Sequence, residues 1–266
     1  MLDVRRRACL AAMGIDLWRI RGDAYDPEDD VPGHLTGSAV PAEPDTATGS
    51  VEHPAPGPTE GPRSEVEGHE PDSPLLDPGP AMLSWDELEA RVASCTSCDL
   101  HPTRTQTVFG VGDRHADLMI IGEAPGADED RLGEPFVGRA GKLLDAMLEA
   151  IGFSRSQVYI ANIIKCRPPG NRDPHIEEAA ACQPYLHRQI ALIQPRLILS
   201  VGRISAHNLL GTEESVGRLR GRVHRFDPGD IPLIVTYHPA YLLRRPQEKS
   251  KSWQDLQAAY RQLHQA

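Results

Sequence analysis

Four of the five cysteines in this 266-residue sequence have a spacing that suggests metal binding. Cys95 and Cys98 form a Cys-x-x-Cys pair, and Cys166 and Cys182 follow it with fifteen residues between them. Two thiolates at a two-residue spacing can chelate one centre, so the four predict a site for zinc or for an iron–sulfur cluster. Ordinary core thiols are the alternative. Cys9 lies apart, and we expect no role for it.

A second group of chemically useful residues stands where apolar runs of the sequence end. Gly122 and Glu123 end one run, Asn162 lies in the second half of another, and His238 follows a third. If these runs are parallel strands, their carboxyl ends meet at one edge of a sheet, and ligands of such sheets bind outside that edge. The sequence therefore predicts that a carboxylate, a carboxamide and an imidazole converge on one pocket.

The elements that must position these residues alternate along the chain. Continuous apolar runs predict strands buried on both faces, over residues 116–122, 158–165, 196–202 and 231–237. Helical spacing of apolar residues predicts helices over residues 141–151, 177–193, 204–210 and 253–263. An earlier helix should begin at Ser84, with Glu87 completing a capping box. Strands that alternate with helices predict an α/β fold, a parallel sheet with helices on both sides.

Composition divides the chain into three parts. Residues 31–80 hold 11 of the 24 prolines and few apolar clusters, so they predict a disordered linker. Residues 1–30 form a short segment, a candidate for docking on the body or on a protein partner. Residues 81–266 are long enough for one core, and we expect the catalytic domain there.

The net charge of −10 is located entirely in the first 80 residues. They contain 16 acidic side chains against 6 arginines, whereas residues 81–266 contain 22 of each sign. The body is neutral with local basic segments at 218–225 and 244–245, which are either phosphate contacts or solvated basic turns.

No run approaches the length of a membrane span, and no signal peptide is evident. We therefore expect a cytoplasmic protein without membrane contact, in which thiols stay reduced.

Five motifs, in this order, give residues 83–262 a resemblance to family 4 uracil-DNA glycosylases, the iron–sulfur branch of that superfamily. They are the Cys-x-x-Cys pair, residues 122–126 with Glu129 and Asp130, residues 134–141, residues 162–169 and residues 238–244. The resemblance implies a 4Fe–4S cluster on Cys95, Cys98, Cys166 and Cys182. It also implies a four-stranded parallel sheet in a three-layer α/β/α arrangement, and activity as a monofunctional enzyme that flips uracil out of DNA and removes it by hydrolysis. We expect it to act as a monomer.

The site residues acquire roles from this resemblance and from the chemistry of a flipped base. Phe136 would stack on the ring, and Asn162 would read the N3–H donor and O4 acceptor that distinguish uracil from cytosine. Glu129 would exclude the methyl group of thymine, and amides near Gly122 would contact the base. Glu123 would stabilise the sugar cation or position water, and His238 would donate to uracil O2.

Four arginines are candidates for DNA phosphates on either side of the flipped base: Arg139, Arg167, Arg172 and Arg244. Two other functions stay open. One is a non-catalytic iron–sulfur DNA-binding module, which would have no need for the catalytic set. The other is a glycosylase for another deaminated base.

Overall fold

A computed structural model describes Ala11, Met13 and residues 79–265 of the chain. The predicted linker and N-terminal segment therefore lie almost wholly outside the described residues. Met13 is fully buried in an apolar cluster with residues of the body, such as Leu144 and Leu256.

The described residues form a six-stranded sheet in the order β1-β3-β2-β4-β6-β5. Its four inner strands are parallel, and the two edge strands β1 and β5 are antiparallel to their neighbours. The strands are β1 Val111–Gly112, β2 Leu118–Gly122, β3 Tyr159–Asn162, β4 Leu197–Val201, β5 Val223–Phe226 and β6 Ile231–Thr236. The four predicted strands are the four inner strands, and both edge strands were missed.

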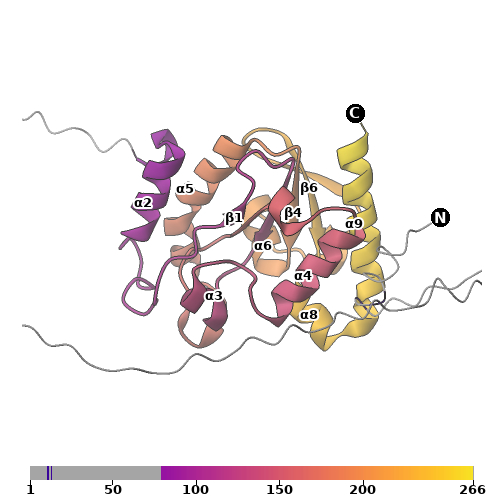
Figure 1. Ribbon diagram of the computed structural model, residues 1–266, viewed down its shortest axis with the longest axis horizontal. Coiled ribbons are helices and arrows are strands. Elements are labelled where there is room, and N and C mark those ends of the chain that lie inside the picture. Colours follow the sequence, from indigo (N-terminus) through magenta and orange to yellow (C-terminus); the bar gives the residue numbers. More distant parts are fainter. Residues whose placement is uncertain (1–10, 12, 14–78, 266) are drawn as a thin grey trace, which may run out of the picture. The chain divides into compact units, whose positions relative to one another are not determined.

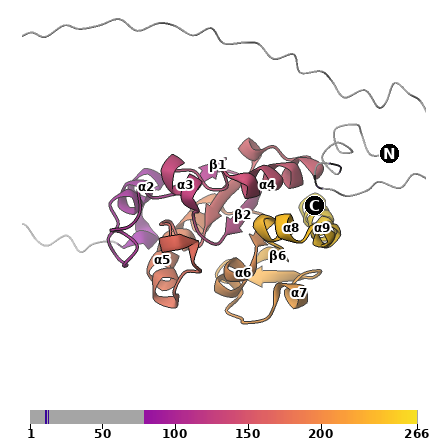
Figure 2. The ribbon, with the colours of Figure 1, turned by 90° about the horizontal axis from the view of Figure 1, so that it is seen from below.

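Helices cover both faces of the sheet, which confirms the α/β/α arrangement (Figures 1 and 2). Figure 2 shows α4 on one side of the sheet and α5 with α6 on the other. The α-helices are α2 Trp85–Ala93, α3 Ala127–Leu132, α4 Arg139–Ala150, α5 Ile176–Ile193, α6 Arg203–Leu210, α7 Val216–Leu219, α8 Pro239–Arg244 and α9 Lys249–His264. Single 3-10 turns lie at Pro80–Met82, Arg155–Gln157, Pro169–Asn171 and Pro246–Glu248.

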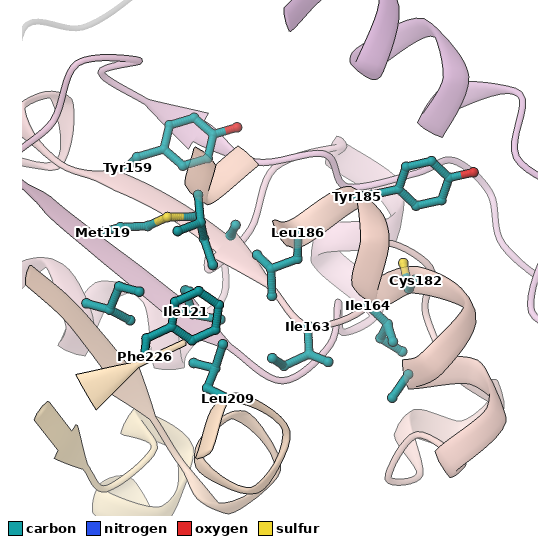
Figure 3. Close-up of a cluster of buried hydrophobic side chains, with 14 of the residues drawn as sticks. Met119, Ile121, Tyr159, Ile163, Ile164, Cys182, Tyr185, Leu186, Leu209 and Phe226 are labelled. Atoms are coloured by element: carbon teal, nitrogen blue, oxygen red, sulfur yellow. The ribbon is translucent and has the colours of Figure 1, made fainter. Parts of the chain in front are cut away.

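Alternate residues of each inner strand enter opposite cores because successive side chains of a strand point to opposite faces. Met119 and Ile121 of β2 belong to the core under α5, together with Ile163, Leu186 and others (Figure 3). Leu118 and Ile120 belong to the core under α4. Burial on both faces explains why these strands read as continuous apolar runs.

Local signals fix several helix ends. Ser84 caps α2 as predicted: its backbone N–H and its hydroxyl donate to the Glu87 carboxylate at 2.8 and 2.6 Å. His238 caps α8, and Pro239 occupies the first helical position, where a missing N–H costs nothing. None of the described helices is both long and apolar enough to cross a bilayer.

Candidate active site

A cavity of about 750 Å³ opens at the carboxyl ends of the four parallel strands. Glu123 follows β2, Asn162 ends β3, Gly202 follows β4 and His238 follows β6, and all four line the cavity. Phe136 joins them from the loop before α4. The structure therefore brings Glu123, Phe136, Asn162 and His238 together, as the sequence predicts for strand-end residues.

Asn162 presents an unsatisfied acceptor to this cavity. Its side chain is almost completely buried, yet Oδ1 has no hydrogen-bond partner among the described residues. A buried acceptor without a partner costs about 1–3 kcal/mol. Such an atom indicates that a donor from outside the protein completes the site.

Gly122 allows Asn162 and Phe136 to approach each other. It pairs with Asn162 across β2 and β3. A Cβ atom at Gly122 would lie 2.5 Å from Asn162 Oδ1 and 2.6 Å from Phe136 Cζ, which is closer than atoms can approach. The side chains of Asn162 and Phe136 therefore occupy the space that a Cβ atom at position 122 would need.

Phe136 is held in an unusual backbone conformation. Its φ of 55° is in the left-handed region, which costs a non-glycine residue of order 1–3 kcal/mol. Arg155 donates to the carbonyl oxygens of Pro135 and Phe136 and pairs with Asp145 at 3.2 Å. These bonds hold the turn, so the ring of Phe136 lies 5.5 Å from that of His238 at an interplanar angle of 30°.

His238 is electrically neutral near pH 7. Burial and, second, the positive charge of Arg244 lower the pKa of its imidazole to about 4, against the opposing effect of Glu129. Its Nδ1 accepts a hydrogen bond from the Ala240 N–H at 3.1 Å, so the single ring proton is on Nε2. The ring can therefore donate one hydrogen bond through Nε2.

Glu123 has a perturbed carboxyl group. Burial and, second, the neighbouring charge of Asp173 raise its pKa to about 7, against the opposing effect of Arg203. The carboxyl group therefore changes charge close to neutral pH. Perturbed acids of this kind concentrate at functional sites.

Glu129 lines the cavity with its carboxylate fixed by backbone amides. Oε1 accepts from Val137 and Gly138 at 3.0 and 3.2 Å, and Oε2 accepts from Gly126 at 3.1 Å. The residue is part of α3, a helix that the sequence analysis did not predict. Glu129 ties the loop after β2 to the loop that carries Phe136.

The four predicted phosphate ligands occupy different surroundings. Arg172 and Arg244 line the cavity, and Arg139 and Arg167 do not. Arg172 is engaged in two hydrogen bonds to Glu178, at 2.6 and 2.9 Å. Arg167 donates to Asn171 at 2.8 Å.

Arg139 and Arg244 are exposed and form no ion pair within the described part of the chain. In the basic segment 218–225, by contrast, three arginines are ion-paired: Arg220, Arg222 and Arg225.

Two charged residues that line the cavity were not predicted from the sequence. Asp173 lies between the turn Pro169–Asn171 and α5, and Arg203 is the first residue of α6. Arg203 was identifiable, because it follows the predicted strand 196–202 at the same sheet edge. Asp173 carried no signal beyond its position after the second strand.

The four cysteines lie around a separate small pocket. Cys95 and Cys98 come from the loop after α2, Cys166 from the segment after β3 and Cys182 from α5. None is in a disulfide. Within the described part of the chain, no three potential ligands are arranged for a single metal ion.

Protein donors point at three of the four sulfur atoms. Arg104 donates to Cys166 Sγ at 3.2 Å, Tyr185 to Cys95 Sγ at 3.4 Å, and the Lys165 N–H to Cys182 Sγ at 3.3 Å. Such donors stabilise thiolates. Burial raises the pKa of Cys182 to about 12, so this thiol ionises only when a cation compensates its charge.

Comparison with known proteins adds independent findings. The sequence profile of the uracil DNA glycosylase superfamily matches residues 109–257. The chain is 47% identical over 172 residues to the type-4 uracil-DNA glycosylase of Archaeoglobus fulgidus, covering 62% of this chain and 86% of that protein. It is 44% identical over 168 residues to the type-4 enzyme of Thermotoga maritima, covering 61% and 87%. A type-5 uracil-DNA glycosylase of Thermus thermophilus is 30% identical over 178 residues, covering 60% and 80%.

Proposed function

The chain belongs to the uracil DNA glycosylase superfamily, and from this premise we propose that it hydrolyses the N-glycosidic bond of uracil in DNA and leaves an abasic site. The observation that carries the proposal is the unsatisfied buried Oδ1 of Asn162 beside Phe136 in a cavity large enough for a nucleoside. A base must leave the helix to reach such a cavity.

Uracil fits the open hydrogen-bonding capacity of Asn162. The N3–H of uracil would donate to Oδ1, and the side-chain amide would donate to O4. Cytosine presents the opposite pattern at these positions and would leave buried groups unpaired, which is strongly disfavoured. Phe136 would stack on the ring, a contact worth about 1–3 kcal/mol.

Glu123 and His238 would share the chemical step. As the bond breaks, the sugar becomes cationic and uracil becomes an anion. The ionised Glu123 would stabilise the cation or hold the attacking water. His238 would donate its Nε2–H to the negative charge that develops on O2. It would do so in its neutral form, which is the form present near pH 7.

Glu129 would act as a fixed wall against the methyl group of thymine. Its support comes from the three backbone amides that restrain its carboxylate, since a restrained side chain cannot move aside for a bulkier base. Amides near Gly122 would add contacts to the base.

Of the four arginines, Arg139 and Arg244 have guanidinium groups without an ion-pair partner among the described residues, and these two would meet phosphates. Arg167 and Arg172 would reach DNA only by sharing or exchanging their present partners. We propose that the protein engages DNA as a monomer.

The four cysteines would hold a 4Fe–4S cluster. Four thiols around one small pocket, with protein donors to three of the sulfurs, support a thiolate-bound cluster there. When bound, the cluster would supply a structural link between the loop after α2, the segment after β3 and α5. Lys165, next to Cys166, is buried and donates to the carbonyl oxygen of Asn162 at 3.0 Å, which connects this region to the base pocket.

Base release from a defined oligonucleotide tests the proposed function. The protein is incubated with single- and double-stranded DNA containing one uracil, and hot alkali then cuts the strand at abasic sites. We expect a cut at the uracil only after alkali, and a strong loss of turnover in Glu123→Gln. DNA binding without release would indicate a non-catalytic module. Release from hypoxanthine-containing DNA but not from uracil-containing DNA would indicate another deaminated base.

A further inference from the structure

Asp173 and Arg203 form an ion pair in the lining of the cavity, which Glu123 also lines. The guanidinium of Arg203 lies 2.5 Å from the Asp173 carboxylate, and both residues line the cavity. They come from segments far apart in the chain, one before α5 and one at the start of α6. Asp173 also acts on the carboxyl group of Glu123, through its charge and as a side-chain hydrogen-bonding partner that raises its pKa.

Two carboxyl groups in hydrogen-bonding contact do not ionise independently. Their negative charges repel each other, so one of the two keeps a proton to a higher pH. Glu123 is the less exposed of the two carboxyl groups, and burial disfavours its charged form. The retained proton therefore falls on Glu123.

We propose that Asp173 and Arg203 are positioning residues that set the pH at which Glu123 becomes ionised, Asp173 favouring its protonated form and Arg203 its carboxylate. The inference deepens the proposed function and rests on it for its catalytic meaning. Neither residue needs to touch the base or the sugar.

The electrostatic surroundings of Glu123 support this division. Its pKa is raised by burial first and by Asp173 second, and is lowered by Arg203. Other ionisable groups face the same cavity from α3, the segment before α5, and the end of β6 with α8: Glu129, Arg172, His238 and Arg244. Glu129 and Arg172 are tied to protein partners and His238 is neutral, so none of these three replaces the pair.

Removing the charge of Asp173 and removing the charge of Arg203 should shift the pH profile of uracil release in opposite directions. With ionised Glu123 as the working form, the rate rises with pH through the pKa of its carboxyl group. Asp173→Asn removes the repulsion and adds an amide donor, so the rise should move to lower pH by about half a unit or more. Near pH 6 the variant would then be roughly two- to threefold faster relative to its own maximum. Arg203→Gln should move the rise to higher pH by a similar amount.

The experiment measures single-turnover uracil release against pH at saturating enzyme for the wild type, Asp173→Asn and Arg203→Gln. Arg225→Gln is the matched control, since Arg225 forms a similarly exposed ion pair with Asp230 on the β5–β6 hairpin. We expect opposite shifts in the two variants, no shift in the control, and smaller shifts at high salt because exposed charges are screened. Unchanged profiles, or shifts in one direction, would overturn the proposal.

A second readout separates this inference from the proposed function. The Glu123 carboxyl carbon can be followed by NMR in glutamate-labelled protein without DNA, with Glu123→Gln providing the assignment. Opposite displacements of its titration in the two variants would support the pair even if no uracil were released. Active wild-type enzyme with a titration unaffected by either variant would refute the pair and leave the glycosylase function intact.

Discussion

Gly122→Ala should damage the base pocket without touching any reacting group. The added Cβ would lie 2.5 Å from Asn162 Oδ1, and 2.6 and 2.7 Å from Cζ and Cε2 of Phe136. Asn162 and Phe136 are both buried, and Phe136 lies in a restrained turn, so moving either side chain aside costs free energy. One methyl group therefore displaces the two side chains that we propose to read and stack the base.

The size of the effect follows from overpacking. Forcing an extra methyl group into a packed site costs about 1–3 kcal/mol. If this cost weakens the transition state and not the bound ground state, single-turnover release should slow by roughly 5- to 150-fold. The melting temperature should fall by about 2–4 °C for each kcal/mol in a body of this size.

Gly217→Ala provides the control. Gly217 also lines the cavity, but a Cβ atom there would meet its nearest neighbour, the Tyr237 hydroxyl, at an ordinary 3.6 Å. The assay is uracil release at saturating enzyme, with thermal melting of each variant. Folded Gly122→Ala protein that releases uracil at the wild-type rate would refute the packing that we assign to Asn162 and Phe136.

Three further predictions follow from single contacts. Asn162→Asp lacks the amide donor for O4 and buries a carboxyl group, so uracil release should fall by roughly 10- to 100-fold; release equal to wild type at neutral pH would contradict this. Arg155→Ala removes the donors to the Phe136 turn. The enzyme concentration for half-maximal uracil release should therefore rise, and the free energy of unfolding should fall by about 1–3 kcal/mol. Arg155→Lys should show a smaller change in both quantities. Cys182→Ser should abolish brown colour and lower the melting temperature, whereas Cys9→Ser should change neither; a colourless wild-type protein purified without air and loaded with zinc would exclude the cluster.

The inner sheet was predictable because burial on both faces leaves a strong mark on a sequence. Each inner strand is four to six residues long and almost wholly apolar. The edge strand β1 has two residues and β5 is mostly exposed, so neither carries such a run. These strands form because an inner strand offers them a free edge, which is a property of the assembled sheet.

The cavity was predictable to the extent that topology alone determines it. Parallel strands end at the same edge of a sheet, so the predicted parallel strands were enough to expect Glu123, Asn162 and His238 close together. The position of Arg203 after a predicted strand places it at the same edge, but its pairing with Asp173 depends on the tertiary structure. The engagement of Arg172 by Glu178 likewise depends on how the loop after β3 folds back on α5.

The site keeps several groups in states that weaken the folded protein when no base is bound. Asn162 has an acceptor without a partner among the described residues, Phe136 has a strained backbone, and partial burial opposes the charge on Glu123. A flipped uracil would satisfy the first of these, and a positive sugar would favour the charge on Glu123. The hydrogen bond to Asn162 needs the base in place, and the stabilised charge on Glu123 needs the reacting sugar. The arrangement of the cavity would therefore be most favourable when the base and its reacting sugar are bound. The hydrogen bonds from Arg155 to the carbonyl oxygens of Pro135 and Phe136 hold the strained turn in place.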